Sequence, residues 1–148
     1  MITLEALIHI KGTQKIDGQE PDITELTTKG TLSRTADGWD LCYDETEATG
    51  LKGTKTTVHI TKNRIVLERT GANASLLVLE KNRRHHSNYA TPYGVIDLGS
   101  YATRLECALT ESGGSLEFAY TLGFNGSINS AHVVHITVQE EPSICQLS

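Results

Sequence analysis

Three carboxylates stand close together in the stretch YDETEATGLKGTKTT, residues 43–57, and they raise the first chemical question. Asp44, Glu45 and Glu47 fall within four positions, and a threonine-rich run punctuated by glycines follows at once. Such a group can supply a general acid and base, ligands for a metal ion, or simply the solvated end of a hairpin. The choice depends on the side of the strand to which each carboxylate points.

Strand alternation separates these acids. If the apolar row that ends in Tyr43 points into the core, the same parity sends Glu45 inward and Asp44 toward solvent. Glu47 falls at or near the following turn. A mechanism that needs two cooperating carboxylates is therefore disfavoured, and Glu45 is the informative acid.

An arginine is predicted on an inward face as well. In RIVLERT, residues 64–70, the side chains of Ile65, Leu67 and Arg69 share one face, so an apolar row ends in a guanidinium. Because an isolated ion inside a protein costs several kcal/mol, we expect Glu45 and Arg69 to pair or to bind something. Three interpretations stay open: a buried pair that fixes strand register, a polar anchor for a ligand, and catalysis.

The remaining reactive side chains form no recognised site. His132 and His135 are three positions apart, which on a strand sends them to opposite faces and disfavours a shared metal ion. Arg83, Arg84, His85 and His86 form a basic cluster, interpreted as a solvated strand end, with an anion or nucleic-acid contact as the alternative. The cysteines are Cys42, Cys107 and Cys145, whose scattered spacing fits free thiols rather than a disulfide or a zinc site.

No nucleophile elbow, P-loop or dinucleotide-binding motif occurs in the sequence. We therefore assign no catalytic residue and expect no metal and no cofactor.

Alternation of period two dominates the sequence and predicts an all-β protein. It occurs in residues 2–10, 24–35, 39–45, 56–61, 64–69, 74–80, 103–111, 115–124 and 131–139. The segments between them are rich in Gly, Asn and Asp, which favour short turns and antiparallel neighbours. Because closing such a sheet removes both exposed edges, we predict an up-and-down barrel of about eight to ten strands, with a sandwich as the alternative.

Length and charge limit the partners. The 148 residues fit a single domain, 1–148, whose last residues from 142 are expected to fray. A net charge of −5 argues against a nucleic-acid partner, and no apolar run is long enough for a membrane helix. The first residues alternate and lack a basic segment, so they do not fit a signal peptide, and we expect a cytoplasmic protein.

The sequence resembles the YwiB-like family of small, uncharacterised bacterial proteins over nearly its whole length. The resemblance lies in LCYDETEATGLKGTKTTVHI, RIVLERTG, YATPYGVIDLG and GSLEFAYTL. The positions that match the family pattern are Tyr43, Glu45, Gly50, Thr56, Arg69, Gly71, Tyr89, Thr91, Gly94 and Tyr120. What the resemblance implies is a closed barrel of the lipocalin-like (calycin) kind, in a family classed as a domain of unknown function.

The leading functional hypothesis is a non-enzymatic barrel that binds a small molecule inside or at one mouth. Glu45 and Arg69 are the expected polar anchors, and Tyr43 and Tyr120 are expected to line the wall. The alternative is a structural or protein-interaction module with a filled core, including self-association as a homodimer. An enzyme is the third hypothesis.

Overall fold

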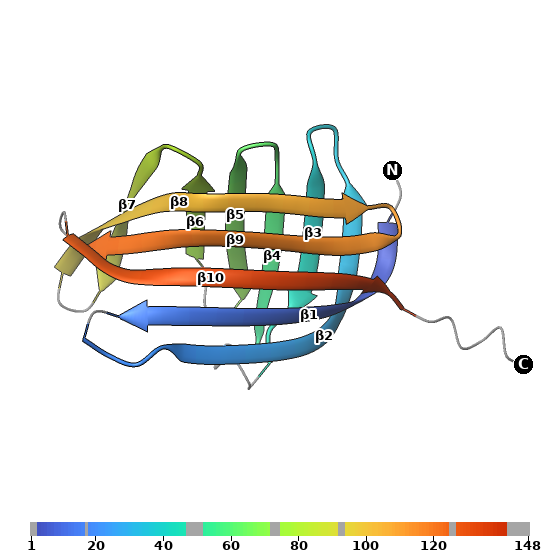
Figure 1. The fold of residues 1–148 in the computed structure, drawn as a ribbon, viewed down its shortest axis with the longest axis horizontal. Helices are drawn as coiled ribbons and strands as arrows, with labels where there is room; N and C mark the ends of the chain where they lie inside the picture. Colours follow the sequence, from blue (N-terminus) through green and yellow to red (C-terminus); the bar gives the residue numbers. More distant parts are fainter. Residues whose placement is uncertain are drawn as a thin grey trace, which may run out of the picture.

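The computed structural model describes residues 3–16, 18–46, 52–71, 75–91, 94–124 and 127–141, which form ten β-strands (Figure 1). The strands are β1 (Thr3–Ile16), β2 (Asp22–Arg34), β3 (Trp39–Asp44), β4 (Thr54–Ile60), β5 (Arg64–Gly71), β6 (Ser75–Glu80), β7 (Arg84–Thr91), β8 (Gly94–Thr110), β9 (Gly113–Phe124) and β10 (Ser127–Glu140). The predicted all-β fold is confirmed. In these ranges no helix is long and apolar enough to cross a membrane.

Strands that follow each other in sequence pair with each other, except β6 and β7, which lie at the two edges of the sheet, and the first strand pairs with the last. The strand order is β6-β5-β4-β3-β2-β1-β10-β9-β8-β7, and all the pairings within this sheet are antiparallel. This is the predicted up-and-down meander, and it curls into a nearly closed barrel.

The two edges of the sheet meet beside β6, and no regular ladder of backbone hydrogen bonds joins them there. The Ser100 hydroxyl of β8 donates a hydrogen bond of 2.7 Å to the Val78 carbonyl oxygen of β6. Next to it, Lys81 and Ala102 form an isolated parallel bridge. Side-chain and single-bridge contacts therefore complete the ring where strand pairing stops.

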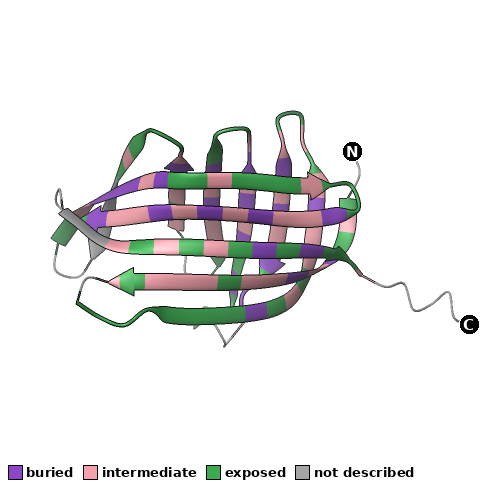
Figure 2. Ribbon diagram, viewed as in Figure 1, coloured by how far each residue is buried: buried purple, intermediate pink, exposed green. Residues whose placement is uncertain are grey.

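The barrel is flattened, and its two walls cross each other. Figure 1 shows β3 to β6 running behind and across β1, β2 and β8 to β10. Buried and exposed residues alternate along the strands, as Figure 2 shows, because successive side chains of a pleated strand point to opposite faces. The fully buried core includes Ala6, Ile8, Leu41, Val58, Ile65 and Leu116, each with 0% exposure.

The two ends of the barrel receive different turns. Because the strands alternate in direction, the odd-numbered strands all finish at one end and all begin at the other. The end at which they begin is tightly packed: Ile60, Ile65, Leu79 and Val138 are at most 3% exposed. The Arg34 guanidinium covers the ring of Trp39 there, 5.0 Å from the ring centroid. We call this the packed end.

Candidate functional site

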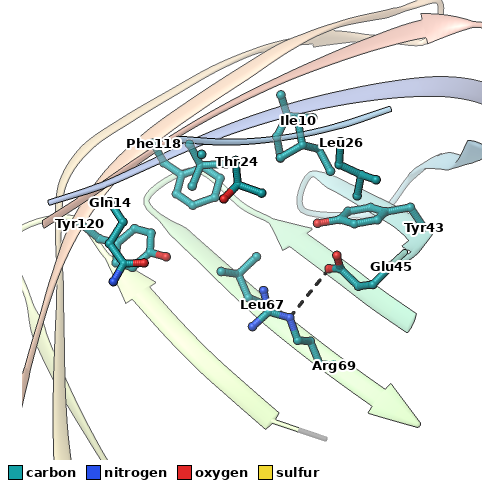
Figure 3. A pocket seen from close by; sticks show the side chains of 13 residues that line it. Ile10, Gln14, Thr24, Leu26, Tyr43, Glu45, Leu67, Arg69, Phe118 and Tyr120 are labelled. Atoms are coloured by element: carbon teal, nitrogen blue, oxygen red, sulfur yellow. Dashed lines mark ion pairs between the residues drawn. The ribbon is translucent and has the colours of Figure 1, made fainter. Parts of the chain in front are cut away.

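The four residues predicted to form a site converge on one cavity at the opposite end of the barrel. Tyr43, Glu45, Arg69 and Tyr120 all line a cavity of about 280 Å³ (Figure 3). We call this the cavity end. Its apolar lining consists of Ile10, Leu26, Leu67, Phe118, Val134 and Ile136. Gln14 and Thr24, which the sequence analysis did not single out, add polar groups from β1 and β2.

Strand register explains why the charged residues meet. Tyr43 of β3 lies opposite Thr56 of β4, and Thr56 lies opposite Arg69 of β5, so these three form one row across the sheet. Glu45 follows Tyr43 by two positions, and its backbone N–H donates to the Thr54 carbonyl oxygen at 2.9 Å. The carboxylate thus stays on the inner face, as its parity predicts, and Asp44 is exposed.

The Glu45 carboxylate is buried and hydrogen-bonded. Its side chain is 3% exposed, and the Thr56 hydroxyl donates to its Oε2 atom at 2.5 Å. The Nε atom of Arg69 lies 3.9 Å from the same oxygen, which is within ion-pair range but too long for a hydrogen bond. The two predicted charges therefore do meet, and the Thr56 hydroxyl is hydrogen-bonded to the carboxylate.

Arg69 is only partly satisfied by this contact. Its side chain is 35% exposed, yet its Nε atom is buried. Within the described part of the chain, that Nε has no hydrogen-bond partner. Because a buried donor without an acceptor is costly, this N–H is the clearest unmet interaction of the site.

Both tyrosines of the site remain protonated. Burial raises the pKa of Tyr43 far above its usual range, the nearby Glu45 carboxylate raises it further, and Arg69 opposes the change. Burial also raises the pKa of Tyr120, again against the effect of Arg69. The two phenols are therefore neutral groups that can donate and accept hydrogen bonds.

A histidine that the sequence analysis left outside the site lies against Tyr120. The His132 ring stacks on the Tyr120 ring with centroids 4.7 Å apart and an interplanar angle of 5°. Its Nε2 atom is 2.8 Å from the Ser130 hydroxyl oxygen, and burial lowers the pKa of the imidazole. His135 lies on the other face beside Glu117, at 3.0 Å, so the two histidines do point apart as predicted.

The basic cluster at the start of β7 has local partners. His85 lies 2.8 Å from a Glu80 oxygen, and His86 lies 3.4 Å from Asp97. The Arg84 guanidinium lies over the ring of Tyr101. These contacts agree with the interpretation as a strand end rather than as a dedicated anion site.

The described ranges include two of the three cysteines. They contain no group of three or more His, Cys, Asp or Glu side chains suited to a metal ion. Cys42 and Cys107 are free. Cys145, Glu47, Gly50 and the predicted tail from 142 lie outside the described residues, as do the side chains of Tyr89 and Thr91.

Comparison with known proteins gives a family and a fold. Residues 8–136 match the family described as Domain of unknown function (DUF1934). The chain is also similar to the crystal structure of the YwiB protein from Bacillus subtilis, with a TM-score of 0.80 and 20% sequence identity over 95% of this chain and 94% of that one. At that identity the likeness establishes the shared fold. No curated protein matches the chain.

Proposed function

We propose that this chain, which belongs to the family described as Domain of unknown function (DUF1934), binds a small molecule at its cavity end, as lipocalin-like (calycin) barrels do. The observation that carries the proposal is the Arg69 side chain, which lines the cavity, is 35% exposed, and has an Nε atom without a hydrogen-bond acceptor in the described residues. A barrel that needed only a filled core would be more stable with apolar side chains there, because burying charges is expensive.

The cavity has the composition expected of a small ligand site. Ligand pockets combine a mostly apolar wall with a few polar groups that fix orientation, and they usually begin near about 300 Å³. At about 280 Å³, this cavity suits a small molecule. Its walls come from both layers of the barrel, since β1, β2, β3, β5, β9 and β10 all contribute side chains.

Gly12 supports the same interpretation, because its missing side chain leaves room in the cavity. A Cβ atom built at Gly12 would meet nothing within 4 Å. Its cross-strand partners Thr24 and Val134 line the cavity too. Close packing therefore does not require glycine here, and a larger residue would enter the space that a ligand needs.

A matched pair of variants tests the proposal. In Gly12→Leu the new side chain fills the cavity. In Lys11→Leu, the control, a leucine replaces the lysine on the outer face. A metabolite library is screened by thermal shift against both variants and the wild-type protein. We expect compounds that stabilise the wild type and Lys11→Leu but not Gly12→Leu.

Compounds that stabilise all three proteins equally would place the binding site elsewhere and contradict the proposal. Circular dichroism and the melting temperature establish that Gly12→Leu is folded. We expect its melting temperature to be no lower than that of the wild type, because the leucine fills open space.

Self-association is the second candidate function, and an outer apolar row favours it. Ile23 is 57% exposed and Val133 is 43% exposed, and both lie opposite Thr13 on neighbouring strands. Sedimentation velocity on the wild type and on Val133→Lys tests this, since a dimer through the row would dissociate in the variant. The cytoplasmic location stays a prediction.

A further inference from the structure

The polar groups of the cavity indicate what kind of ligand would fit. We infer that the ligand is a small organic monoanion, a carboxylate carried on an apolar body, whose carboxylate is bound by the Arg69 guanidinium. This rests on the proposed function and names the ligand class for the same cavity.

Arg69 is not saturated by its contact with Glu45. The Glu45 oxygen nearest to it, at 3.9 Å, is too far to accept its Nε hydrogen, and that oxygen already takes a hydrogen bond from Thr56 at 2.5 Å. The guanidinium lines the cavity beside Leu67, as Figure 3 shows. A planar guanidinium binds a carboxylate through two parallel hydrogen bonds, and because the Nε atom itself is buried, a ligand carboxylate would bind the terminal N–H groups of this partly exposed side chain.

The charged side chains of the cavity limit the charge of the ligand. Of the titratable side chains that line the cavity, Glu45 and Arg69 carry opposite charges, and the two tyrosines are neutral. A phosphate dianion would bring two negative charges close to the buried Glu45 carboxylate, which like-charge repulsion opposes. A cation would be repelled by Arg69, which is the more accessible of the two. A single negative charge is the best match.

The body of the ligand would contact the deeper, apolar part of the cavity. Arg69 is the partly exposed group, while Phe118 and Ile136 deeper in the cavity are each 1% exposed. Gly12 leaves open space in the same cavity. The carboxylate would therefore lie toward the mouth, and an apolar chain or ring would lie against these side chains, where its burial is favourable.

Paired probes that differ only in charge test this inference. Hexanoate and phenylacetate are titrated into the protein by calorimetry, alongside hexanamide and phenylacetamide, which have nearly the same shape without the charge. We expect the acids to bind about ten to a hundred times more tightly than the amides, the range of a hydrogen bond to a charged group. Gly12→Leu should abolish binding of both.

Two variants separate the charges. Arg69→Gln removes the guanidinium, and we expect the preference for acids over amides to disappear. Glu45→Gln keeps an oxygen that accepts the Thr56 hydrogen but removes the neighbouring negative charge, so we expect the acids to bind several-fold more tightly and the amides to bind as before. Glu45→Gln keeps the test decisive if Arg69→Gln does not fold.

The outcomes distinguish this inference from the proposed function. If acids and amides bind equally well and Gly12→Leu blocks both, the inference that the ligand is an anion is wrong, but the cavity remains a binding site. Tighter binding of hexylamine than of hexanoate, or weaker binding of acids by Glu45→Gln, would also overturn it. Binding that Gly12→Leu does not affect would overturn both.

Discussion

The packed end and the cavity end of the barrel are built from the same strands, yet their inward rows carry different chemistry. On β5 the inward side chains are, in chain order, Ile65, Leu67 and Arg69. On β3 the inward row begins at Trp39 and ends at Glu45, just beyond the strand. Both rows change from apolar to charged in the direction of the cavity end. We therefore expect core substitutions at the packed end to cost more stability than those at the cavity end, which keeps polar groups and open space.

The largest expected effect compares two neighbours on the inner face of β5. Ile65 at the packed end is 0% exposed, whereas Leu67 lines the cavity and is 8% exposed. We expect Ile65→Ala to lower the free energy of unfolding by about 2–5 kcal/mol, because it leaves a hole in a close-packed region. Leu67→Ala should cost less, because its side chain already borders a space. Urea denaturation measures both, and an equal loss would remove the distinction between the ends.

Two glycines extend the comparison to the backbone. A Cβ atom at Gly30 would meet the Cys42 carbonyl oxygen and lie 2.6 Å from Ile8 Cδ1, whereas one at Gly12 would meet nothing within 4 Å. We expect Gly30→Ala to lose about 1–3 kcal/mol or more through overpacking. Gly12→Ala should gain about 0.4–1 kcal/mol, since alanine restricts the unfolded chain more than glycine does. Thermal melts of the two variants check the opposite signs, and a destabilised Gly12→Ala would contradict the open space.

A pair of threonines tests the hydrogen bond that holds Glu45. Thr56 is 0% exposed and donates to the buried carboxylate, while the next residue, Thr57, makes only a 3.6 Å contact with the Cys42 sulfur. We expect Thr56→Val to lose about 1–3 kcal/mol, because the carboxylate loses its hydroxyl donor. Thr57→Val should change little. Equal effects in chemical denaturation would show that the hydroxyl does not support the site.

The smallest expected effects concern two histidines with opposite pH dependence. His59, on the outer wall, lies 3.0 Å from Glu68 and 2.9 Å from Asp40. The hydrogen bond to Glu68 raises the pKa of His59 most, Asp40 adds to it, and burial opposes it. Its stabilising contribution is therefore complete below the unfolded pKa of about 6.5 and is lost as the pH rises through the folded pKa.

His132, against Tyr120 at the cavity end, should behave in the opposite way. Burial lowers its pKa, so its contribution is present above the unfolded pKa of about 6.5 and is lost as the pH falls through the folded pKa. We expect His59→Gln to lower the free energy of unfolding, with the largest loss at acid pH. The loss should be less than about 1 kcal/mol, because the ion pairs of His59 are partly exposed. His132→Phe should reduce the loss of stability on acidification. Melting curves between acid and neutral pH measure how the stability of each variant, relative to the wild type, changes with pH. Changes of the same sign in the two variants would contradict the opposite pKa shifts of His59 and His132.

Much of the site was predictable because strand parity is a local property. The pleat fixes the alternation of faces, so the residues that follow Tyr43 and Leu67 by two positions had to point inward. This placed Glu45 and Arg69 on the inner face before any fold was known. The barrel followed from the same alternation together with the turn residues between the strands.

The rest depended on register and bulges, which single strands do not reveal. That Thr56 lies between Glu45 and Arg69 follows from the pairing of three strands. Gln14 and Thr24 line the cavity because the β1–β2 hairpin extends beyond the part of β2 that pairs with β3. His132 lies on the same strand face as Val134 and Ile136, and this spacing in the sequence indicates an inward side chain. The contact of His132 with Tyr120 could be predicted only from the pairing of β9 with β10. The register shift between Ala102 and Arg104 left no mark in the sequence pattern.

We expect ligand binding at the cavity end and not at the packed end. An NMR titration of isotope-labelled protein with hexanoate tests this most directly, because it reports on every backbone amide and on the Arg69 Nε–H together. We predict shifts at Gly12, Phe118, Tyr120 and the Arg69 Nε–H, with little change at Leu32 or Ile65. Shifts spread over the outer face, or concentrated at the packed end, would contradict it.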